Sequence, residues 1–444
     1  MMDLSAEVVT VLMLGGILLG VLTGYPLAGI LGVLAFAVGY LIRGDAVFSL
    51  MYNRVFDFLT NYTLLAVPLF VFMGNVLGSS GITDKLYNAL YLWLGGVRGG
   101  LAIATILIGT LLAACLGIIT ASVAMLAVVG LPAMLKRGYD KSLATGAVCS
   151  GGSLGILIPP SVMIIIYGPM ASLSVGSLFM AAFMPGFLLS ALYCSYVVVR
   201  CTVQPRLAPS IPVEERPKGT LIFKVWQLTS AVVPTLALIL AVLGSIYFGV
   251  AAPTEAAGVG ALAAVVLVAG NRRLNWRVLR EAADDTTKVC GMLFFFIIMS
   301  VAFTGVFILA GAREVVGQFI LAAPGGRWGA FLVIMIICFI LGMFIDWIGI
   351  VLIMVPIITP IGQALGFDSI WFAMMIMVNL QMSFITPPFA SAIFICRGTA
   401  APELGVTTND IIRGVIPYVA LIVLALLLCA MFPQIILWLP SKMV

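Results

Sequence analysis

Long apolar runs, separated by short stretches with polar residues, glycine or proline, follow one another along the whole chain. Runs of about 20 apolar residues are long enough to cross the hydrocarbon core of a bilayer as helices. The pattern therefore predicts an all-α integral membrane protein. The expected helices are 8–21, 26–42, 63–77, 82–94, 101–135, 142–158, 160–170, 178–199, 225–250, 256–269, 290–310, 313–323, 330–358, 371–385, 388–396 and 411–437.

Some of these segments can be read in more than one way. The first two runs are either two helices or one long tilted helix, and the number of crossings before Thr63 stays open. The segments 82–94 and 313–323 mix polar with apolar residues and are expected to lie along the membrane interface. Residues 271–285 form a charged amphipathic stretch.

Helix-breaking residues recur in the same order in the two parts of the chain. A shift of 228 residues places Pro132 on Pro360 and Pro159–Pro160 on Pro387–Pro388. Breakers that keep their order indicate an internal repeat. The predicted repeats are 1–200 and 225–444, joined by a cytoplasmic loop at 201–224. Each has scaffold helices, an interfacial arm, a hairpin (about 100–135 and about 329–360) and a broken helix (about 142–170 and about 371–398).

The distribution of Lys and Arg predicts how the repeats are oriented. Residues 136–141 contain three basic residues, whereas 361–370, which follow the corresponding proline, contain none. The segments 200–224 and 272–280 are also basic, and basic loops lie on the cytoplasmic side. If each interrupted segment is a re-entrant hairpin and each broken helix crosses once, 361–370 lies on the opposite side. The repeat is then inverted.

Composition excludes several classes of function. Hydrophobic residues make up 63% of the chain and charged residues 9%, and histidine is absent. Histidine-based catalysis and histidine-ligated metal sites are therefore excluded. The eight cysteines form no C-x-x-C pair, and no P-loop motif is present, so we expect no transition metal, no disulfide framework and no ATPase of its own. The net charge of +5 lies in loops and predicts topology, not nucleic-acid binding. The N-terminus has no basic n-region, so the first apolar run is expected to remain as a helix.

The two Pro-Pro motifs interrupt apolar runs, where a helix should be continuous. The first reads SGGSLGILIPPS, from Ser150 to Ser161, and the second lies in NLQMSFITPPFASAIF, from Asn379 to Phe394. Proline removes a backbone donor and frees carbonyl groups, which need a partner inside a membrane. A bound cation is one such partner, and neighbouring helices around a simple proline kink are another.

Each Pro-Pro motif follows an apolar segment that is itself interrupted. The first interruption, within Leu112–Leu126, carries Thr120 and Ser122, and the second, within Ile340–Met354, carries Asp346. A carboxylate inside a membrane is costly and usually functional. Asp346 is a cation ligand, a proton carrier, a partner of backbone NH groups at a hairpin tip, or a helix-end cap that faces water.

Two further charged residues have a structural and a functional interpretation. Thr254 or the preceding turn is expected to cap a helix that has Glu255 in its first turn, with a buried ion pair of Glu255 as the alternative. Arg397 is expected at a helix end near the interface, with attraction of an anionic substrate as the alternative.

Four motifs, GILIPPS, LPAMLKRGYD, APTEAAGVGA and FITPPF, resemble the large, DctM-like membrane subunit of tripartite ATP-independent periplasmic (TRAP) transporters, and the resemblance covers nearly the whole chain. It implies the ion-transporter-superfamily fold, an inverted-repeat elevator-type transporter with two re-entrant hairpins and two broken helices. It also implies sodium-coupled import of an organic acid across the bacterial inner membrane. The implied partners are a small four-helix DctQ-like membrane subunit and a DctP-like periplasmic binding protein.

The resemblance also implies binding sites for two or more sodium ions, without an organic cofactor, and for a small carboxylate between them. The first sodium site would use Thr120, Ser122, Gly152, Gly155, Ile158 and Pro159. The second would use Asp346, Gly349, Ser383, Thr386 and Pro387. The substrate would contact Ser153, Ser161, Asn379 and Ser391. The chain departs from the family pattern at 118–122 and after the second Pro-Pro, at 389–392. Its TNYTLLAVPLF and TPPF stretches look closer to members that handle 2-oxo acids or related carboxylates.

Three other functions remain as alternatives. An ion channel would need rings of pore-lining residues rather than two internal sites. An intramembrane enzyme would need catalytic groups, and the broken helices lack histidine and paired carboxylates. A stand-alone carrier without a binding protein is compatible with the same sequence.

Overall fold

The regular elements of this protein are helices throughout the part that the computed structural model describes, residues 4–117, 119–210 and 220–443. Seven of the described helices are long and apolar enough to cross a bilayer, and the number rises to eight if the bent pair 46–59 and 62–78 is one span. The predicted all-α membrane protein is therefore confirmed.

The helices of the two parts of the chain follow in order. The first part contains α1 (Ala6–Leu22), α2 (Leu27–Arg43), α3 (Ala46–Leu59), α4 (Ala66–Gly78), α5 (Ile82–Leu94), α6 (Gly100–Leu116), α7 (Ile119–Leu135), α8 (Lys141–Ser153), α9 (Val162–Ala171) and α10 (Val175–Val203). The second part contains α11 (Leu221–Tyr247), α12 (Pro253–Gly270), α13 (Trp276–Leu309), α14 (Ala312–Leu321), α15 (Gly326–Phe344), α16 (Trp347–Ala364), α17 (Ser369–Ser383), α18 (Ser391–Thr399), α19 (Thr408–Met431) and α20 (Gln434–Leu437).

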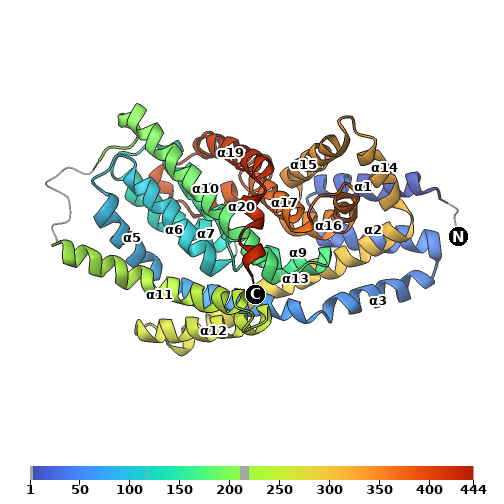
Figure 1. The fold of residues 1–444 in the computed structure, drawn as a ribbon, viewed down its shortest axis with the longest axis horizontal. Helices are drawn as coiled ribbons and strands as arrows, with labels where there is room; N and C mark the ends of the chain where they lie inside the picture. Colours follow the sequence, from blue (N-terminus) through green and yellow to red (C-terminus); the bar gives the residue numbers. More distant parts are fainter. Residues whose placement is uncertain (1–3, 118, 211–219, 444) are drawn as a thin grey trace.

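The same kinds of helix contact occur in both parts. Helix α6 packs against α7 and α8, and α15 packs against α16 and α17. The short helix α9 packs against α16, and α18 packs against α7, so the helix after each Pro-Pro contacts the hairpin of the other part. Figure 1 shows α3, α11 and α12 along one long edge of the molecule, and α1, α2 and α14 toward one end. The inverted orientation of the two repeats stays a prediction.

Close backbone contacts hold α8, the first half of the broken helix, between its neighbours. A β-carbon at Gly152 would lie 2.5 Å from a methyl carbon of Val123 and 2.9 Å from its Cα. The backbones of α7 and α8 are therefore in close contact at this point. A β-carbon at Gly146 would collide with the carbonyl group of Gly414 in α19. Small residues that let backbones approach are typical of membrane helix packing. The glycines of α8 thus allow close packing against α7 and α19, in addition to their place beside the helix break.

Helix α13 differs from the two elements expected in its place. The charged stretch 271–285 and the apolar run 290–310 were expected to be separate, but Trp276–Leu309 is one helix. The side chain of Asn275 accepts a hydrogen bond from the Val278 amide at 2.8 Å and caps the helix. Arg277 and Glu281 pair at 2.7 Å, one turn apart on the exposed face. A long helix therefore extends out of the apolar region without a break.

The sequence did not predict α3. Its residues include Arg54 and Asp57, which interrupt the apolar pattern, and most of its side chains are exposed. The helix packs against α13, where the aliphatic part of Arg54 lies beside Gly305. This tertiary contact supports a helix that sequence periodicity did not reveal.

The remaining boundaries lie close to the expected ones. The first two apolar runs are separate helices, α1 and α2, which pack against each other. Helix α10 continues to Val203, and α11 begins at Leu221, so helices take up part of the predicted loop 201–224. Residues 211–219 of that loop lie outside the described residues.

Candidate functional site

The first hairpin, α6 and α7, turns beside the first Pro-Pro motif. Gly117 ends α6 with φ +61°, and a β-carbon there would lie 3.2 Å from the carbonyl oxygen of Pro160. The Pro159–Pro160 peptide bond is cis. In the expected tip, Ser122 is buried, Thr120 is exposed, and Ile118 lies outside the described residues. The fold thus brings this hairpin turn next to the break between α8 and α9.

The predicted ligands on the first broken helix are all buried. Gly152, Gly155, Ile158 and Pro159 lie in the α8 end and the irregular segment after it, which includes a short 3₁₀ turn, Leu154–Ile156. The hydroxyl of Ser153 donates to the carbonyl oxygen of Ser150 at 2.9 Å. The hydroxyl of Ser161 donates to the carbonyl oxygen of Ile156. Both hydroxyl oxygens keep acceptor capacity, because a hydroxyl that donates still has lone pairs.

The second hairpin, α15 and α16, turns at Ile345 and Asp346. Asp346 immediately precedes α16, and its side chain is exposed. A carboxylate at this position is favoured by the helix dipole. A β-carbon at Gly349 would contact Leu27 of α2 and Phe296 of α13. This side of Gly349 therefore faces α2 and α13, and not Ser383, with which it was predicted to share a sodium site.

The second Pro-Pro motif is tied to α15. The amide of Phe389 donates to the carbonyl oxygen of Met343 at 3.1 Å, and the Pro387–Pro388 bond is cis. The hydroxyl of Thr386 donates to the carbonyl oxygen of Met382 at 2.7 Å. The other predicted residues of this region lie on α17 and α18. Ser383 is buried beside Gly342, and the side-chain amide of Asn379 donates to the carbonyl oxygen of Met335 at 2.8 Å. Ser391 is half-buried at the start of α18.

Three buried polar side chains near the breaks have no hydrogen-bond partner among the described residues. They are the hydroxyls of Ser150 and Ser383 and both amide atoms of Gln381. Leaving a buried polar group unpaired costs about 1–3 kcal/mol. Such groups at helix breaks are candidates for contact with a polar ligand, an ion or an ordered water molecule.

Gln381, like Ser150, is a residue to which the sequence analysis assigned no role in a binding site. It is fully buried in α17, two residues before Ser383. A signal was present in the sequence, because Gln381 is one of the few amide side chains in an apolar run. Only the structure shows that its amide lacks a hydrogen-bond partner within residues 4–117, 119–210 and 220–443.

The segments around the two helix breaks also contact each other. The thiol of Cys149 in α8 donates to the carbonyl oxygen of Ala392 in α18 at 3.6 Å. With α18 on α7 and α9 on α16, the hairpins and broken helices form one connected group. No group of three or more histidine, cysteine or acidic residues able to hold a metal ion occurs among the described residues. This region offers oxygen ligands from serine and threonine hydroxyls, the backbone, the Gln381 amide and the Asp346 carboxylate, and hard cations prefer oxygen.

Comparison with known proteins decides the family. Residues 11–435 match the family described as "Tripartite ATP-independent periplasmic transporter, DctM component". This chain belongs to the DctM family. The resemblance inferred from the four sequence motifs is confirmed. A DctM protein is the large permease component of a TRAP transporter, and the curated relatives whose names state a role are named as permeases, not enzymes.

The DctM relatives match along most of the chain. The C4-dicarboxylate TRAP transporter large permease protein DctM of Pseudomonas aeruginosa is 31% identical, covering 90% of this chain and 91% of its own. The isethionate TRAP transporter permease protein DctMQ of Oleidesulfovibrio alaskensis is 28% identical, covering 93% of this chain and 63% of its own. The YdaH transporter of Alcanivorax borkumensis has a similar fold, with a TM-score of 0.61, 15% identity, and coverage of 97% of this chain and 99% of its own.

Two other charged residues of this DctM chain have the structural positions expected for them. Glu255 lies in the first turn of α12 as predicted, and its carboxylate accepts a hydrogen bond from the amide of Ala252 at 2.8 Å. The cap position belongs to Ala252 in the preceding turn, because the Thr254 hydroxyl has no partner among the described residues. Arg397 lies in the last turn of α18, where its guanidinium donates to the carbonyl oxygen of Val406. This position agrees with a helix-end role.

Proposed function

We propose that this DctM chain is the permease subunit of a sodium-coupled secondary transporter that imports a small organic acid across the bacterial inner membrane. A DctP-like periplasmic binding protein would deliver the substrate, and a DctQ-like subunit would complete the membrane part. The two hairpins and two broken helices would move as one body against the outer helices, as an elevator, with the two repeats inverted. The observation that carries the proposal is the set of unpaired, buried polar groups at the two breaks.

Sodium binding is supported by the chemistry of these groups. Ser150, Ser383 and Gln381 supply oxygen atoms that lack partners among the described residues, and the irregular segments after α8 and α17 free backbone carbonyl groups. An oxygen-lined site of this kind suits sodium, and Asp346 adds a negative charge at the turn of the second hairpin. Each cation that crosses with the membrane potential contributes about 2.3 kcal/mol per 100 mV.

An anionic substrate is supported by the helices that begin after the breaks. Ser161 precedes α9, and Ser391 begins α18. The start of a helix presents free amide groups and the positive end of its dipole, which favour an anion. The two relatives described above are named for a C4-dicarboxylate and for isethionate, and both compounds are anions. A carboxylate between Ser153, Ser161, Asn379 and Ser391 is the substrate position that we propose.

The proposed partner subunit is supported by the relative from Oleidesulfovibrio alaskensis, whose name, DctMQ, joins the two membrane components in one protein. A stand-alone carrier remains the second candidate, because the same binding region serves either arrangement. The two differ in whether uptake requires the binding protein.

Reconstitution in proteoliposomes tests the proposal. The chain is inserted with its small subunit, and uptake of candidate organic acids is measured with the binding protein, with and without an inward sodium gradient. We expect uptake that requires both. Uptake that ignores the sodium gradient would overturn the coupling, and uptake that needs no binding protein would favour the stand-alone carrier.

Two substitutions test the ion ligands. Asp346→Asn and Thr120→Ala should each raise the sodium concentration for half-maximal uptake by about tenfold, the equivalent of about 1.4 kcal/mol. Asp284→Asn is the matched control, because Asp284 is exposed on α13 and pairs with Arg280 at 3.8 Å at the surface. Unchanged sodium dependence in both test variants would refute the ligand assignment.

A further inference from the structure

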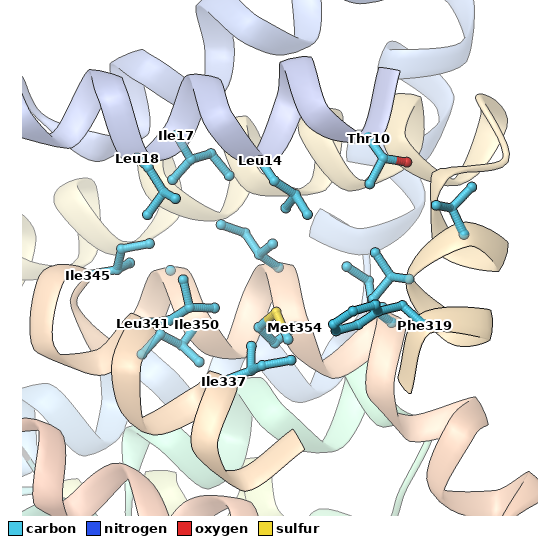
Figure 2. Close-up of a pocket in the computed structure, with 15 residues that line it drawn as sticks. Thr10, Leu14, Ile17, Leu18, Phe319, Ile337, Leu341, Ile345, Ile350 and Met354 are labelled. Atoms are coloured by element: carbon cyan, nitrogen blue, oxygen red, sulfur yellow. The ribbon is translucent and has the colours of Figure 1, made fainter. Parts of the chain in front are cut away.

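An apolar cleft of about 380 Å³ lies between the outer helices α1 and α14 and the second hairpin, α15 and α16. Figure 2 shows Leu14, Ile17 and Leu18 on the α1 side, opposite Ile345 and Ile350 of the hairpin. The cleft is separate from the buried polar groups at the helix breaks. Its volume is within the range of small-molecule sites, about 300–1,000 Å³.

The lining of the cleft offers no free polar group. Its residues are aliphatic or aromatic except for Thr10, Gly349 and Met354, and the hydroxyl of Thr10 donates to the carbonyl oxygen of Ala6 in its own helix at 2.6 Å. An ordered water needs two to four polar partners, so the cleft favours an apolar occupant over water.

The depth of the cleft is comparable with one leaflet of a bilayer. The α16 residues that line it, from Gly349 to Ile357, span about 12 Å at 1.5 Å per residue. The hydrocarbon of one leaflet is about 15 Å thick. Trp328, at the other end of this hairpin, is 45% exposed and lies under the Arg327 guanidinium, an arrangement typical of residues at the membrane interface. The cleft thus runs from the turn of the hairpin toward an interface.

The rim of the cleft is exposed. Leu18 is 47% exposed and Phe319 is 70% exposed, and both belong to its lining. The chain has several helices long and apolar enough to cross a bilayer, so an exposed apolar rim on them is suited to contact with lipid. We propose that an acyl chain of a bilayer phospholipid enters through this rim and occupies the cleft.

The position of the cleft gives the acyl chain a role in transport. One wall belongs to α1 and α14 and the other to the second hairpin, so displacement of the hairpin changes the shape of the cleft. A bound acyl chain stabilises the arrangement in which the cleft is open, because a ligand shifts an equilibrium by its differential affinity for the two states. This consequence rests on the proposed movement of the hairpins, whereas the lipid site itself does not.

Photolabelling tests the site in the whole protein, reconstituted in vesicles with a phospholipid that carries a photoactivatable diazirine in its acyl chain. We expect labelling of peptides from α1 and from 349–357, and loss of that labelling when unlabelled phospholipid is added in excess. Labelling confined to the exposed outer faces would overturn the proposal. Labelling of the cleft that disappears when the small membrane subunit is added would also overturn it, because the cleft would then be a protein interface.

A cleft-filling substitution provides a second test. Leu14→Trp should lower labelling of 349–357 at least fivefold, because the indole takes the space of the acyl chain. Leu19→Trp is the matched control on the same helix, since Leu19 is 69% exposed and does not line the cleft. Equal labelling in Leu14→Trp and Leu19→Trp would contradict the proposal. The sodium requirement for uptake, measured in the same vesicles, tests the proposed function separately.

Discussion

The turn of the first hairpin depends on one glycine that no other residue replaces without strain. Gly117 has φ +61°, a conformation that costs an L-amino acid about 1–2 kcal/mol. A β-carbon there would also lie 3.2 Å from the Pro160 carbonyl oxygen, which is closer than ordinary contact. We therefore expect Gly117→Ala to displace the hairpin turn from the first Pro-Pro motif.

The size of the effect follows from that strain. If sodium binding requires the turn in its present position, 1–2 kcal/mol reduces the apparent sodium affinity by about 5- to 30-fold, since 1.4 kcal/mol corresponds to a factor of ten. The measurement is the sodium concentration that gives half-maximal uptake in proteoliposomes. The amount of correctly inserted, monodisperse protein is determined for each variant, so that loss of protein is not counted as loss of affinity.

Gly366→Ala is the matched control. Gly366 has φ +76°, follows α16 at the other end of the second hairpin, and has no atom within 4 Å of the position that a β-carbon would take. It has the same conformational strain without a contact to a helix break. Wild-type sodium dependence in Gly117→Ala, or an equal shift in Gly366→Ala, would show that the turn does not shape the ion site.

Two more predictions concern packing and the unpaired amide. Gly109→Ala would place a β-carbon 2.5 Å from the carbonyl oxygen of Gly151, so we expect a loss of about 1–3 kcal/mol in the free energy of unfolding, measured by denaturant titration. Gly258→Ala, where the β-carbon meets open space, should be neutral or stabilising, and equal stability of the two variants would contradict the argument. Gln381→Leu removes two unpaired buried polar atoms and should leave stability unchanged or higher while uptake falls at least tenfold. Wild-type uptake in this variant would exclude Gln381 as a ligand.

Much of the fold could be predicted from the sequence because breaks and apolar runs are local signals. The interruption at Asp346 and the two Pro-Pro motifs appear in the structure where the sequence places them. Helices α3 and α13 could not be predicted in the same way. Arg54 interrupts the apolar pattern of α3, so the sequence does not predict a helix there. Its contact with Gly305 of α13 supports the helix in the structure.

The candidate site could be predicted only in part. The sequence shows which residue types have suitable polar atoms, but not which of those atoms already have a partner in the fold. The residue type identified Ser383 as a candidate, and the structure shows that its hydroxyl lacks a partner among the described residues. The hydroxyls of Ser153 and Thr386 were equally good candidates, and each donates to a backbone carbonyl oxygen of its own segment while its lone pairs stay available. Gln381 stood in the same motif without an assigned role, and its unpaired amide became visible only after the chain was folded.

Apolar runs and the positions of proline are enough to predict a helical membrane protein and the places where its helices break. Both properties follow from apolar length and from the backbone chemistry of proline, which act within a few residues. The tertiary structure decided which breaks lie together, which polar atoms stay unpaired, and that an apolar cleft separates α1 from the second hairpin. These features depend on contacts between residues that are far apart in the chain, such as Cys149 with Ala392, and local patterns do not contain them.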